Sequence, residues 1–527
     1  MATVTILRPP LLVPTWSDSG PLTPPIGPAY LAASLRQAGH VARIVDGLGE
    51  NPSQVTRLFD DRVMAIGLRS EEIVERIEPS DLIGISCMFS QDWPEIRRLI
   101  QMVRRRFPGV PIVAGGEHIT ATAAFTLDST PEVDVCVIGE GEETIVELAA
   151  AVQNGTPFDS IPGLVLRVEQ GSRPGLPMHS DKTTRSTGSR TRIRNLDDIP
   201  WPAWDLVPLA NYLDNGLGYG VDRGRSMPMI ATRGCPYQCT FCSNPEMWTT
   251  RWYARDPEKV LEEIQTYRER YNATNFDFYD LTAIVKRSWI IQFTNRILER
   301  KMEFTWQLPS GTRSEAIDDE VSRLLYESGC RNMSYAPESG SPEVLKRIKK
   351  VVKLDRLEAS VRGAVRSGLN VKLNIIMGFP NESRSELGQT VRFLARMGFI
   401  GVHDMSVSLF SPYPGSELYH ELRKSGRIPE LSDEYFLGLC AYKDFSQSVS
   451  YTDGLSPGVL NVYRILGFLV FYGTQYAVRP WRMARLLMNL VQHRQESRLD
   501  KSLQDLAHRI RNRRSTGPTP KRADAAG

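Results

Sequence analysis

Cysteine and histidine are scarce in this sequence, with 7 of each among 527 residues. Three of the cysteines fall within one short segment, and the other four are isolated in apolar or helical surroundings: Cys87, Cys136, Cys330 and Cys440. That segment contains one Cys-x2-Cys pair. The chain has no other such pair and no His-x3-His pair, one of which a structural zinc site normally uses to complete its four ligands. A disulfide framework is equally unexpected in a long chain with so few cysteines. We therefore expect the isolated cysteines to be buried as small hydrophobic side chains.

The sequence also lacks a strong net charge and a long apolar run. The net charge is only +3, so we expect no nucleic-acid partner. The apolar stretch 465–472 is too short for a membrane span of about 20 residues. The first residues contain no basic segment followed by a long apolar run, so we expect no secretory leader and a reducing, cytoplasmic location. A hydrophobic content of 41% is sufficient for sizeable cores in several domains.

Short apolar runs alternate with helical patterns over the first 150 residues. Strands are predicted at 4–7, 42–46, 82–86, 111–114 and 135–138, and helices at 27–39, 93–106 and from Glu143. This alternation predicts an α/β domain with a doubly wound, Rossmann-like parallel sheet. Ligands of such sheets bind beyond the carboxyl ends of the strands. Glycine-rich and polar segments follow those ends, at 8–10, 46–49, 86–90, 115–118 and 139–142.

A second run of strand and helix patterns begins near Met227. Six strands are predicted, at 229–232, 276–279, 305–308, 332–336, 371–377 and 401–409, with helices such as 256–271 and 318–328 between them. Six parallel strands cannot close an eight-stranded barrel, so we expect an open (β/α)6 barrel with its site at the carboxyl ends of the strands. A connector should precede it, with a strand at 163–168, a mobile polar loop at 183–192 and a strap at 197–206 whose two tryptophans serve packing.

The most informative motif is the spacing Cys-x3-Cys-x2-Cys at Cys235, Cys239 and Cys242, directly after the first of these strands. Three thiolates on one loop can hold three irons of a [4Fe–4S] cluster and leave the fourth iron open to a small molecule. A zinc site and a coincidental loop are the alternatives. With Phe241 before the last cysteine, the segment resembles the signature of the radical S-adenosylmethionine (SAM) superfamily.

This resemblance implies a [4Fe–4S] cluster that binds SAM and cleaves it reductively to a 5′-deoxyadenosyl radical. The segments after the later strands are similar to the SAM-side elements of that superfamily, and the implied SAM contacts are Phe241, Asp280, Ser310, Arg313, Glu338, Ser339 and Gly378. Two positions depart from the pattern. Asp280 stands where two acidic residues are common, and Asn381 replaces a glycine in Gly-Phe-Pro-Gly-Glu-Thr.

The N-terminal segment resembles the cobalamin-binding domain of the B12-dependent radical SAM family, through the runs that start at Pro24, Gly115 and Ile138. The implied cobalamin contacts are Pro10, Gly27, Ser86, Met88, Phe89, Gly115, Gly116, His118, Gly139, Glu140 and Gly141. The Asp-x-His-x-x-Gly motif, whose histidine binds cobalt in many such domains, does not occur. Cobalamin is then bound without a protein histidine below cobalt, or the domain has lost the cofactor. We expect His118 to hydrogen-bond the cofactor or the loop rather than to bind cobalt.

Beyond about residue 420 the alternation of strand and helix patterns stops. The C-terminal part is basic, with 12 Lys or Arg against 4 Asp or Glu from Arg479 onward. A helical cap on the barrel, a lid for a lipophilic substrate and an interfacial helix near anionic lipid all fit it. Residues 515–527 are expected to be disordered. The predicted division is 1–154 for the cobalamin domain, 155–225 for the connector, 226–420 for the radical SAM core and 421–527 for the helical region.

These features predict a cobalamin-dependent radical SAM enzyme, most simply a C-methyltransferase that acts on an unactivated carbon of a small or lipophilic substrate. A flavodoxin or ferredoxin is the expected electron donor. A non-methylating relative, such as an oxidative ring-forming cyclase, shares the same motifs. A cluster-bearing sensor without turnover is a third reading.

Overall fold

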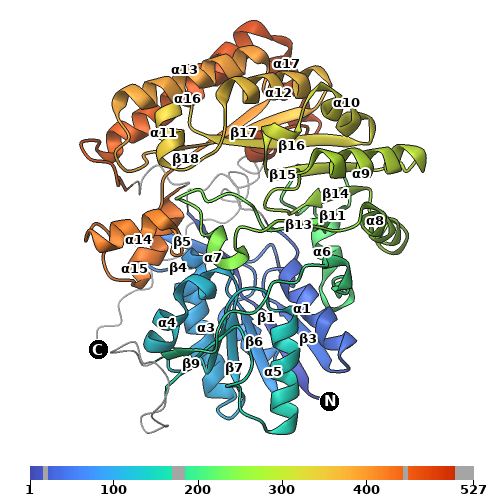
Figure 1. The fold of residues 1–527 in the computed structure, drawn as a ribbon, viewed down its shortest axis with the longest axis vertical. Helices are drawn as coiled ribbons and strands as arrows, with labels where there is room; N and C mark the ends of the chain where they lie inside the picture. The colour runs from blue at the N-terminus through green and yellow to red at the C-terminus, as the bar shows by residue number, and fades with distance from the viewer. Residues whose placement is uncertain (16–21, 169–183, 443–448, 505–527) are drawn as a thin grey trace, which may run out of the picture.

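The chain is described here from a computed structural model that covers residues 1–15, 22–168, 184–442 and 449–504. The predicted disordered residues 515–527 lie outside these ranges. Two parallel sheets dominate the fold, and Figure 1 shows the N-terminal sheet in the lower half of the view and the second sheet in the upper half. The predicted α/β class, with two βα units and a helical C-terminal region, is confirmed.

The N-terminal sheet contains the five predicted parallel strands. These are β1 (Thr3–Arg8), β3 (Val41–Asp46), β6 (Leu82–Ser86), β7 (Ile112–Gly115) and β8 (Val135–Val137), in the order β8-β7-β6-β1-β3. The helices α1 (Ile26–Gln37) and α5 (Glu142–Asn154) cover one face, and α2 (Ser70–Glu75), α3 (Trp93–Arg106) and α4 (Glu117–Ser129) cover the other. The strand order reverses between β1 and β6, which is where sheets of this kind bind ligands.

Three features of the first 190 residues differ from the prediction. An additional antiparallel sheet is formed by β2 (Leu11–Pro14), β5 (Val63–Ile66) and β4 (Val55–Leu58). The predicted strand at 163–168 is present as β9 (Leu164–Arg167), but it joins the N-terminal sheet at the edge of β8. The prediction of a mobile loop at 183–192 is wrong for β10 (Thr184–Ser186), because this segment pairs antiparallel with β9 and so satisfies its backbone hydrogen bonds.

The second sheet has six strands, each parallel to its neighbours, in chain order. They are β11 (Ser226–Met229), β14 (Asn275–Phe278), β15 (Thr305–Thr312), β16 (Cys330–Glu338), β17 (Asn370–Met377) and β18 (Asp404–Leu409). Its outer helices are α8 (Pro257–Tyr271), α9 (Arg287–Glu299), α10 (Asp319–Glu327), α11 (Pro342–Arg347), α12 (Leu354–Arg366) and α13 (Arg384–Ile400). No pairing joins β11 to β18 among the described residues, so the barrel is open as predicted.

The first barrel strand starts and ends earlier than predicted. Residues Thr232–Arg233 form the short strand β12, which pairs with β13 (Tyr253–Ala254) instead of continuing β11. The cause is a contact with a residue distant in sequence, because the backbone N–H groups of Ala231 and Thr232 donate to the carboxylate of Asp280 rather than to a neighbouring strand.

The C-terminal helices pack on both halves of the molecule. The helices α14 (Glu417–Lys424) and α15 (Asp433–Gly438) share a core cluster with α3 and α4 of the N-terminal sheet. The helix α16 (Pro457–Val478) packs against α13 and β18, and α17 (Trp481–Val491) follows it. None of the helices in the described ranges is long and apolar enough to cross a membrane.

Two smaller predictions about packing concern cysteine and tryptophan. The four isolated cysteines are buried, as expected: Cys87, Cys136, Cys330 and Cys440. In the strap, Trp204 is buried in the core, whereas Trp201 is 37% exposed. The packing interpretation therefore fits Trp204 better than Trp201.

Candidate functional site

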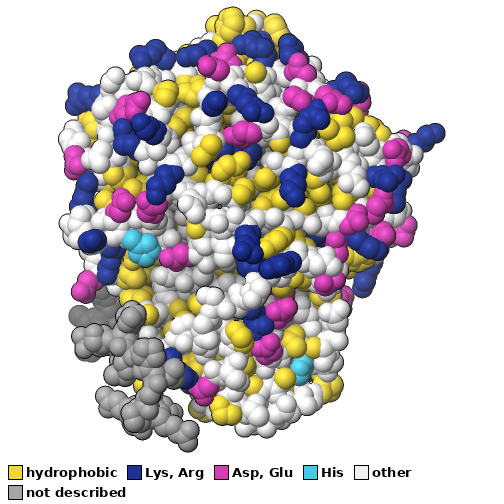
Figure 2. All heavy atoms as spheres, viewed as in Figure 1, with side chains coloured by type: hydrophobic (Ala, Val, Ile, Leu, Met, Phe, Trp, Pro, Cys, Tyr) yellow, Lys and Arg dark blue, Asp and Glu magenta, His cyan; other side chains and the backbone are white. Residues whose placement is uncertain are grey.

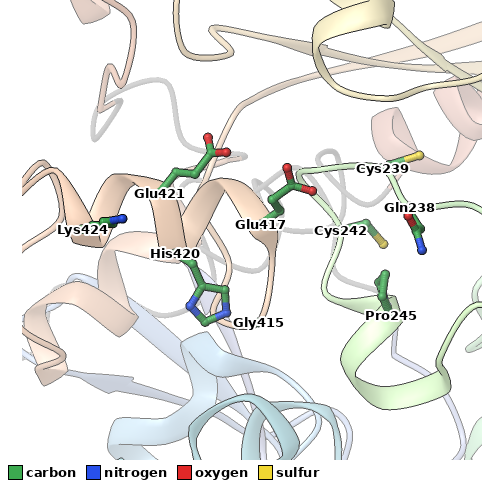
Figure 3. Close-up of a pocket in the computed structure, with 9 residues that line it drawn as sticks. All are labelled: Gln238, Cys239, Cys242, Pro245, Gly415, Glu417, His420, Glu421 and Lys424. Atoms are coloured by element: carbon green, nitrogen blue, oxygen red, sulfur yellow. The ribbon is translucent and has the colours of Figure 1, made fainter.

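The cysteine loop lies between the two large sheets, after β12 and before α7 (Asn244–Trp248), which occupies the middle of Figure 1. The backbone N–H of Cys242 donates to the carbonyl of Cys239 at 3.1 Å, which keeps these two residues in one turn. Both line an open cavity of about 450 Å³. Figure 3 shows the loop with Cys239 and Cys242 on one side and α14, which supplies Glu417, His420 and Glu421 to the cavity wall, on the other.

The three thiols of this loop are partly buried, and none of them is in a disulfide. Burial raises the pKa of Cys242 to about 12 and also raises the pKa of Cys239, so both are thiols until a metal displaces the proton. Across the described ranges, no group of three such side chains converges on a point where a single metal ion would bind. A four-iron cluster requires no such convergence, because each thiolate binds a different iron. The donor set therefore fits a [4Fe–4S] cluster.

The N-terminal domain holds the start of the cysteine loop through Arg233. Its Nη1 lies 3.2 Å from Oε1 of Glu140, and its Nη2 lies 2.6 Å from Oε1 of Glu142. The guanidinium also stacks over the ring of Tyr30, 5.1 Å from the centroid. Arg192 occupies the other Glu140 oxygen at 3.1 Å. These side chains are almost entirely buried, so the loop after β8 and the cysteine loop form one ionic network.

The end of the cysteine loop is held in the same way. The Ser243 hydroxyl donates to the carboxylate of Glu117, which begins α4 directly after the Gly115-Gly116 pair. Burial raises the pKa of Glu117. A few residues on, the Thr120 hydroxyl contacts the sulfur of Met247 in α7 at 3.3 Å. Both ends of the cysteine loop therefore contact the loops at the carboxyl edge of the N-terminal sheet.

Some of the predicted cobalamin contacts line an open surface at that edge. Met88 and Phe89 follow β6 and are 49% and 43% exposed, which is unusual for large apolar side chains. Gly27 is exposed in the first turn of α1, and a Cβ there would meet no atom within 4 Å. Gly116 has φ +118°, and a Cβ there would lie 2.5 Å from the carbonyl oxygen of Cys87. An apolar surface beside closely spaced backbone fits a large ligand such as cobalamin.

The other predicted contacts in this group are less open. Ser86, Gly115, Gly139 and Gly141 are partly buried, and Pro10 is buried. Glu140 is committed to the two arginines described above.

His118 is only 1% exposed and lies in the core. Its Nδ1 is 3.0 Å from the Ser90 hydroxyl, and its ring packs between Trp93 and Phe436, with centroids 4.9 and 5.2 Å away. Burial lowers the pKa of His118 to about 3, so the imidazole is neutral. His118 is expected to hydrogen-bond either the cofactor or the loop. The structure shows a contact with the loop, through Ser90 after β6.

The predicted SAM contacts lie at the carboxyl ends of the barrel strands, close to the cysteine loop. Phe241 packs against Phe379, with ring centroids 5.5 Å apart. The Arg313 guanidinium lies 3.7 Å from the ring centroid of Tyr237, inside the cysteine motif. Ser310 is a partly buried residue of β15.

Three more of these predicted contacts have partners within the protein. Glu338 forms an ion pair with Lys350 at 3.0 Å. Ser339 contacts the hydroxyl of Thr390 at 3.1 Å. The amide of Gly378, which has φ +87°, donates to Glu382 at 2.6 Å.

Asp280 is turned toward the strand that leads into the cysteine loop. Its carboxylate accepts from the Thr232 amide and, at 2.5 Å, from the Thr232 hydroxyl, and burial raises its pKa to about 6. It therefore supports the residue that precedes Arg233.

Sequence reasoning missed several residues of this site. Lys350 lies near enough to influence the thiol of Cys239, and Tyr237 stacks on Arg313. Glu382 accepts the amides of both Gly378 and Phe379. Glu382 stood inside a motif that the sequence already singled out, whereas no local pattern marks Lys350.

Two protein-family models match the chain. The B12 binding domain matches residues 17–149, and the radical SAM superfamily matches residues 229–394. A methyltransferase of Pyrococcus horikoshii is 29% identical over 76% of this chain and 78% of its own length. The cytidylyl-2-hydroxyethylphosphonate methyltransferase of Streptomyces wedmorensis is 28% identical over 78% of this chain and 80% of its own.

More distant similarities point in the same direction. The anaerobic magnesium-protoporphyrin IX monomethyl ester cyclase of Rubrivivax gelatinosus is 24% identical over 76% of this chain and 66% of its own. A solved radical SAM methyltransferase from Kitasatospora setae, with cobalamin and a [4Fe–4S] cluster bound, has the same fold, with a TM-score of 0.61. It is 18% identical, over 81% of this chain and 75% of that one.

Proposed function

Because this chain belongs to the cobalamin-dependent radical SAM enzymes, we propose that it is a C-methyltransferase acting on an unactivated carbon of a small or lipophilic substrate. The observation that carries the proposal is the double contact of the cysteine loop with the N-terminal domain, through Arg233 and through Ser243. These contacts bring the carboxyl ends of both sheets together, so that a cobalamin on one and a SAM molecule on the other share one space.

Cysteine thiolates at 235, 239 and 242 would hold the cluster, and the open surface at Gly27, Met88 and Phe89 would hold cobalamin. When bound, the cluster supplies the electron that cleaves SAM to a carbon radical, and cobalamin supplies a carrier for the methyl group. The chain itself contributes positioning. Arg313 and the Lys350–Glu338 pair lie beside the cysteine loop, where they would orient the charged groups of SAM.

The relatives support methylation as the first choice, since two of the three sequence relatives described above are methyltransferases. Oxidative ring formation is the second candidate function, because one of the relatives is a cyclase. A flavodoxin or ferredoxin as electron donor, and a cytoplasmic location, complete the proposal.

The radical chemistry is tested without a substrate. The protein is reconstituted anaerobically with iron and sulfide, reduced and supplied with SAM, and 5′-deoxyadenosine is measured. We expect product from the wild type and none from the Cys239→Ala variant. A Cys330→Ala variant, which removes a buried thiol away from the loop, serves as the matched control and should retain product formation. Equal product from the Cys239→Ala protein would refute the cluster assignment.

A further inference from the structure

The helices α16 and α17 expose an unusual amount of apolar surface. Among the described residues, 21 large hydrophobic side chains are exposed, and 10 of them come from the thirty residues between 462 and 491. They are Val462, Ile465, Leu466, Leu469, Val478, Trp481, Met483, Leu487, Met488 and Val491. Concentrations of this kind mark interaction surfaces, whereas single exposed apolar residues are ordinary.

The exposed residues follow the helical repeat. On α16 they stand at Val462, Ile465, Leu466 and Leu469, and on α17 the spacing is repeated at Ala484, Leu487, Met488 and Val491. Residues at these intervals share one side of a helix. The opposite sides pack on the protein, through residues such as Phe471 and Asn489, which are 0% and 6% exposed. Each helix therefore presents an apolar stripe outward, the reverse of an ordinary surface helix.

The charge of this segment is predominantly positive. From Gly454 to Gln495 the sequence has five arginines and no aspartate or glutamate. Arg464 is buried, and Arg485 forms an ion pair with Glu496. Arg479 and Arg482 donate to backbone carbonyls of residues 399, 400 and 402, which are neutral acceptors and leave these two positive charges uncancelled. Figure 2 shows hydrophobic side chains at the top of the molecule, where Figure 1 places α17, with Lys and Arg beside them.

We propose that the outward stripes of α16 and α17, here called the α16–α17 face, dock on an anionic lipid surface. Apolar side chains with a tryptophan and flanking arginines are the combination that lies flat at a bilayer interface. A second copy of the chain fits less well, because a two-fold interface through this face would bring Arg479 and Arg482 of the two copies toward one another.

The docking surface is connected to the barrel mouth. α16 begins beside the carboxyl end of β17, where Leu460 contacts Gly378 closely enough that a Cβ on that glycine would lie 2.9 Å from the leucine methyl. The helix α17 lies at the opposite, amino end of the barrel strands, where Arg482 donates to the carbonyl of Val402 just before β18 (Figure 1). Docking through α17 would therefore leave the barrel mouth facing away from the lipid.

Vesicle sedimentation tests the docking without cluster, cobalamin or SAM, so its outcome is separate from that of the catalytic proposal. The full chain is mixed with vesicles of phosphatidylglycerol and phosphatidylcholine, or of phosphatidylcholine alone. We expect binding at least about tenfold stronger to the anionic vesicles, and weaker binding as salt is raised. The double variant Leu487→Glu/Val491→Glu should lose at least about tenfold in affinity, because two apolar contacts are replaced by negative charges.

The matched control is Val55→Glu, a charge introduced at a 55% exposed valine of β4, which should bind like the wild type. Thermal midpoints of all variants establish that they are folded. The proposal is overturned if the wild type does not sediment with anionic vesicles, or if both variants bind equally. It is also overturned if sedimentation velocity shows a dimer that the double variant dissolves, or if an acidic soluble protein binds the face while vesicles do not.

Discussion

Nη1 of Arg233 lies 3.2 Å from Oε1 of Glu140, and this contact joins the cysteine loop to the N-terminal domain. The two side chains are 6% and 4% exposed, so the pair is shielded from water. Removing one partner of a buried pair leaves an uncompensated charge, which is far more costly than losing a surface ion pair.

We therefore predict that Glu140→Ala destabilises the protein by about 3–5 kcal/mol and lowers the iron content after reconstitution, because Arg233 and Arg192 lose a shared partner. The matched control is Glu143→Ala, which removes a 54% exposed carboxylate from Arg190 and should cost about 0–1 kcal/mol. Urea unfolding and iron analysis provide the two readouts. Equal losses in the two variants would contradict an ionic link between the domains.

The loops around the proposed cobalamin surface allow a paired glycine test. Gly116→Ala should destabilise the apoprotein by about 1–3 kcal/mol or more, because φ is +118° and the new methyl group would meet the Cys87 carbonyl. Gly27→Ala has open space and should leave the unfolding midpoint unchanged. Its methyl group would occupy the space in which we propose that cobalamin binds, so cobalamin affinity should fall. Unchanged cobalamin affinity in a folded Gly27→Ala protein would remove Gly27 from the site.

The carboxyl group of Glu382 predicts a pH dependence of stability. Burial raises its pKa to about 7 from an ordinary value of 4.5. Between these values the folded protein binds more protons than the unfolded chain, so the contribution of Glu382 to stability falls as the pH rises and is constant above pH 7. Glu382→Gln does not titrate. The free energy of unfolding of the wild type should therefore fall relative to this variant by up to about 3 kcal/mol across that window.

Urea unfolding of both proteins at the two ends of this window measures the difference. The exposed Glu430 provides a control, since Glu430→Gln should show no such trend against the wild type. A pH-independent difference between wild type and Glu382→Gln would show that this carboxyl has no raised pKa.

The sequence predicted the elements that carry local patterns. Strands such as β3 and helices such as α3 have strong periodicity, and their positions agree with the prediction to within a residue. The small sheet β2-β5-β4 was missed because its strands are only four residues long and because β2 pairs with a strand far away in the sequence. The end of β11 was misplaced because Asp280, nearly fifty residues away, takes the backbone hydrogen bonds of Ala231 and Thr232.

The site was predictable in part for the same reason. The cysteine spacing and the glycine-rich strand ends are local signals, and the structure brings these segments together at the meeting of the two sheets. The partners of Arg233 are about ninety residues away in sequence, and no spacing rule connects them. Lys350 follows another lysine just after α11 and resembles an ordinary surface residue until the fold pairs it with Glu338, which leaves its side chain 9% exposed.

Transfer of a labelled methyl group from SAM to cobalamin distinguishes the methyltransferase from its alternative. The protein is reconstituted anaerobically with iron, sulfide and cobalamin, reduced, and given SAM labelled in its methyl group. We predict label on the bound cobalamin together with 5′-deoxyadenosine. Bound cobalamin and 5′-deoxyadenosine without any label on cobalamin would contradict the methyltransferase and favour the oxidative, ring-forming alternative.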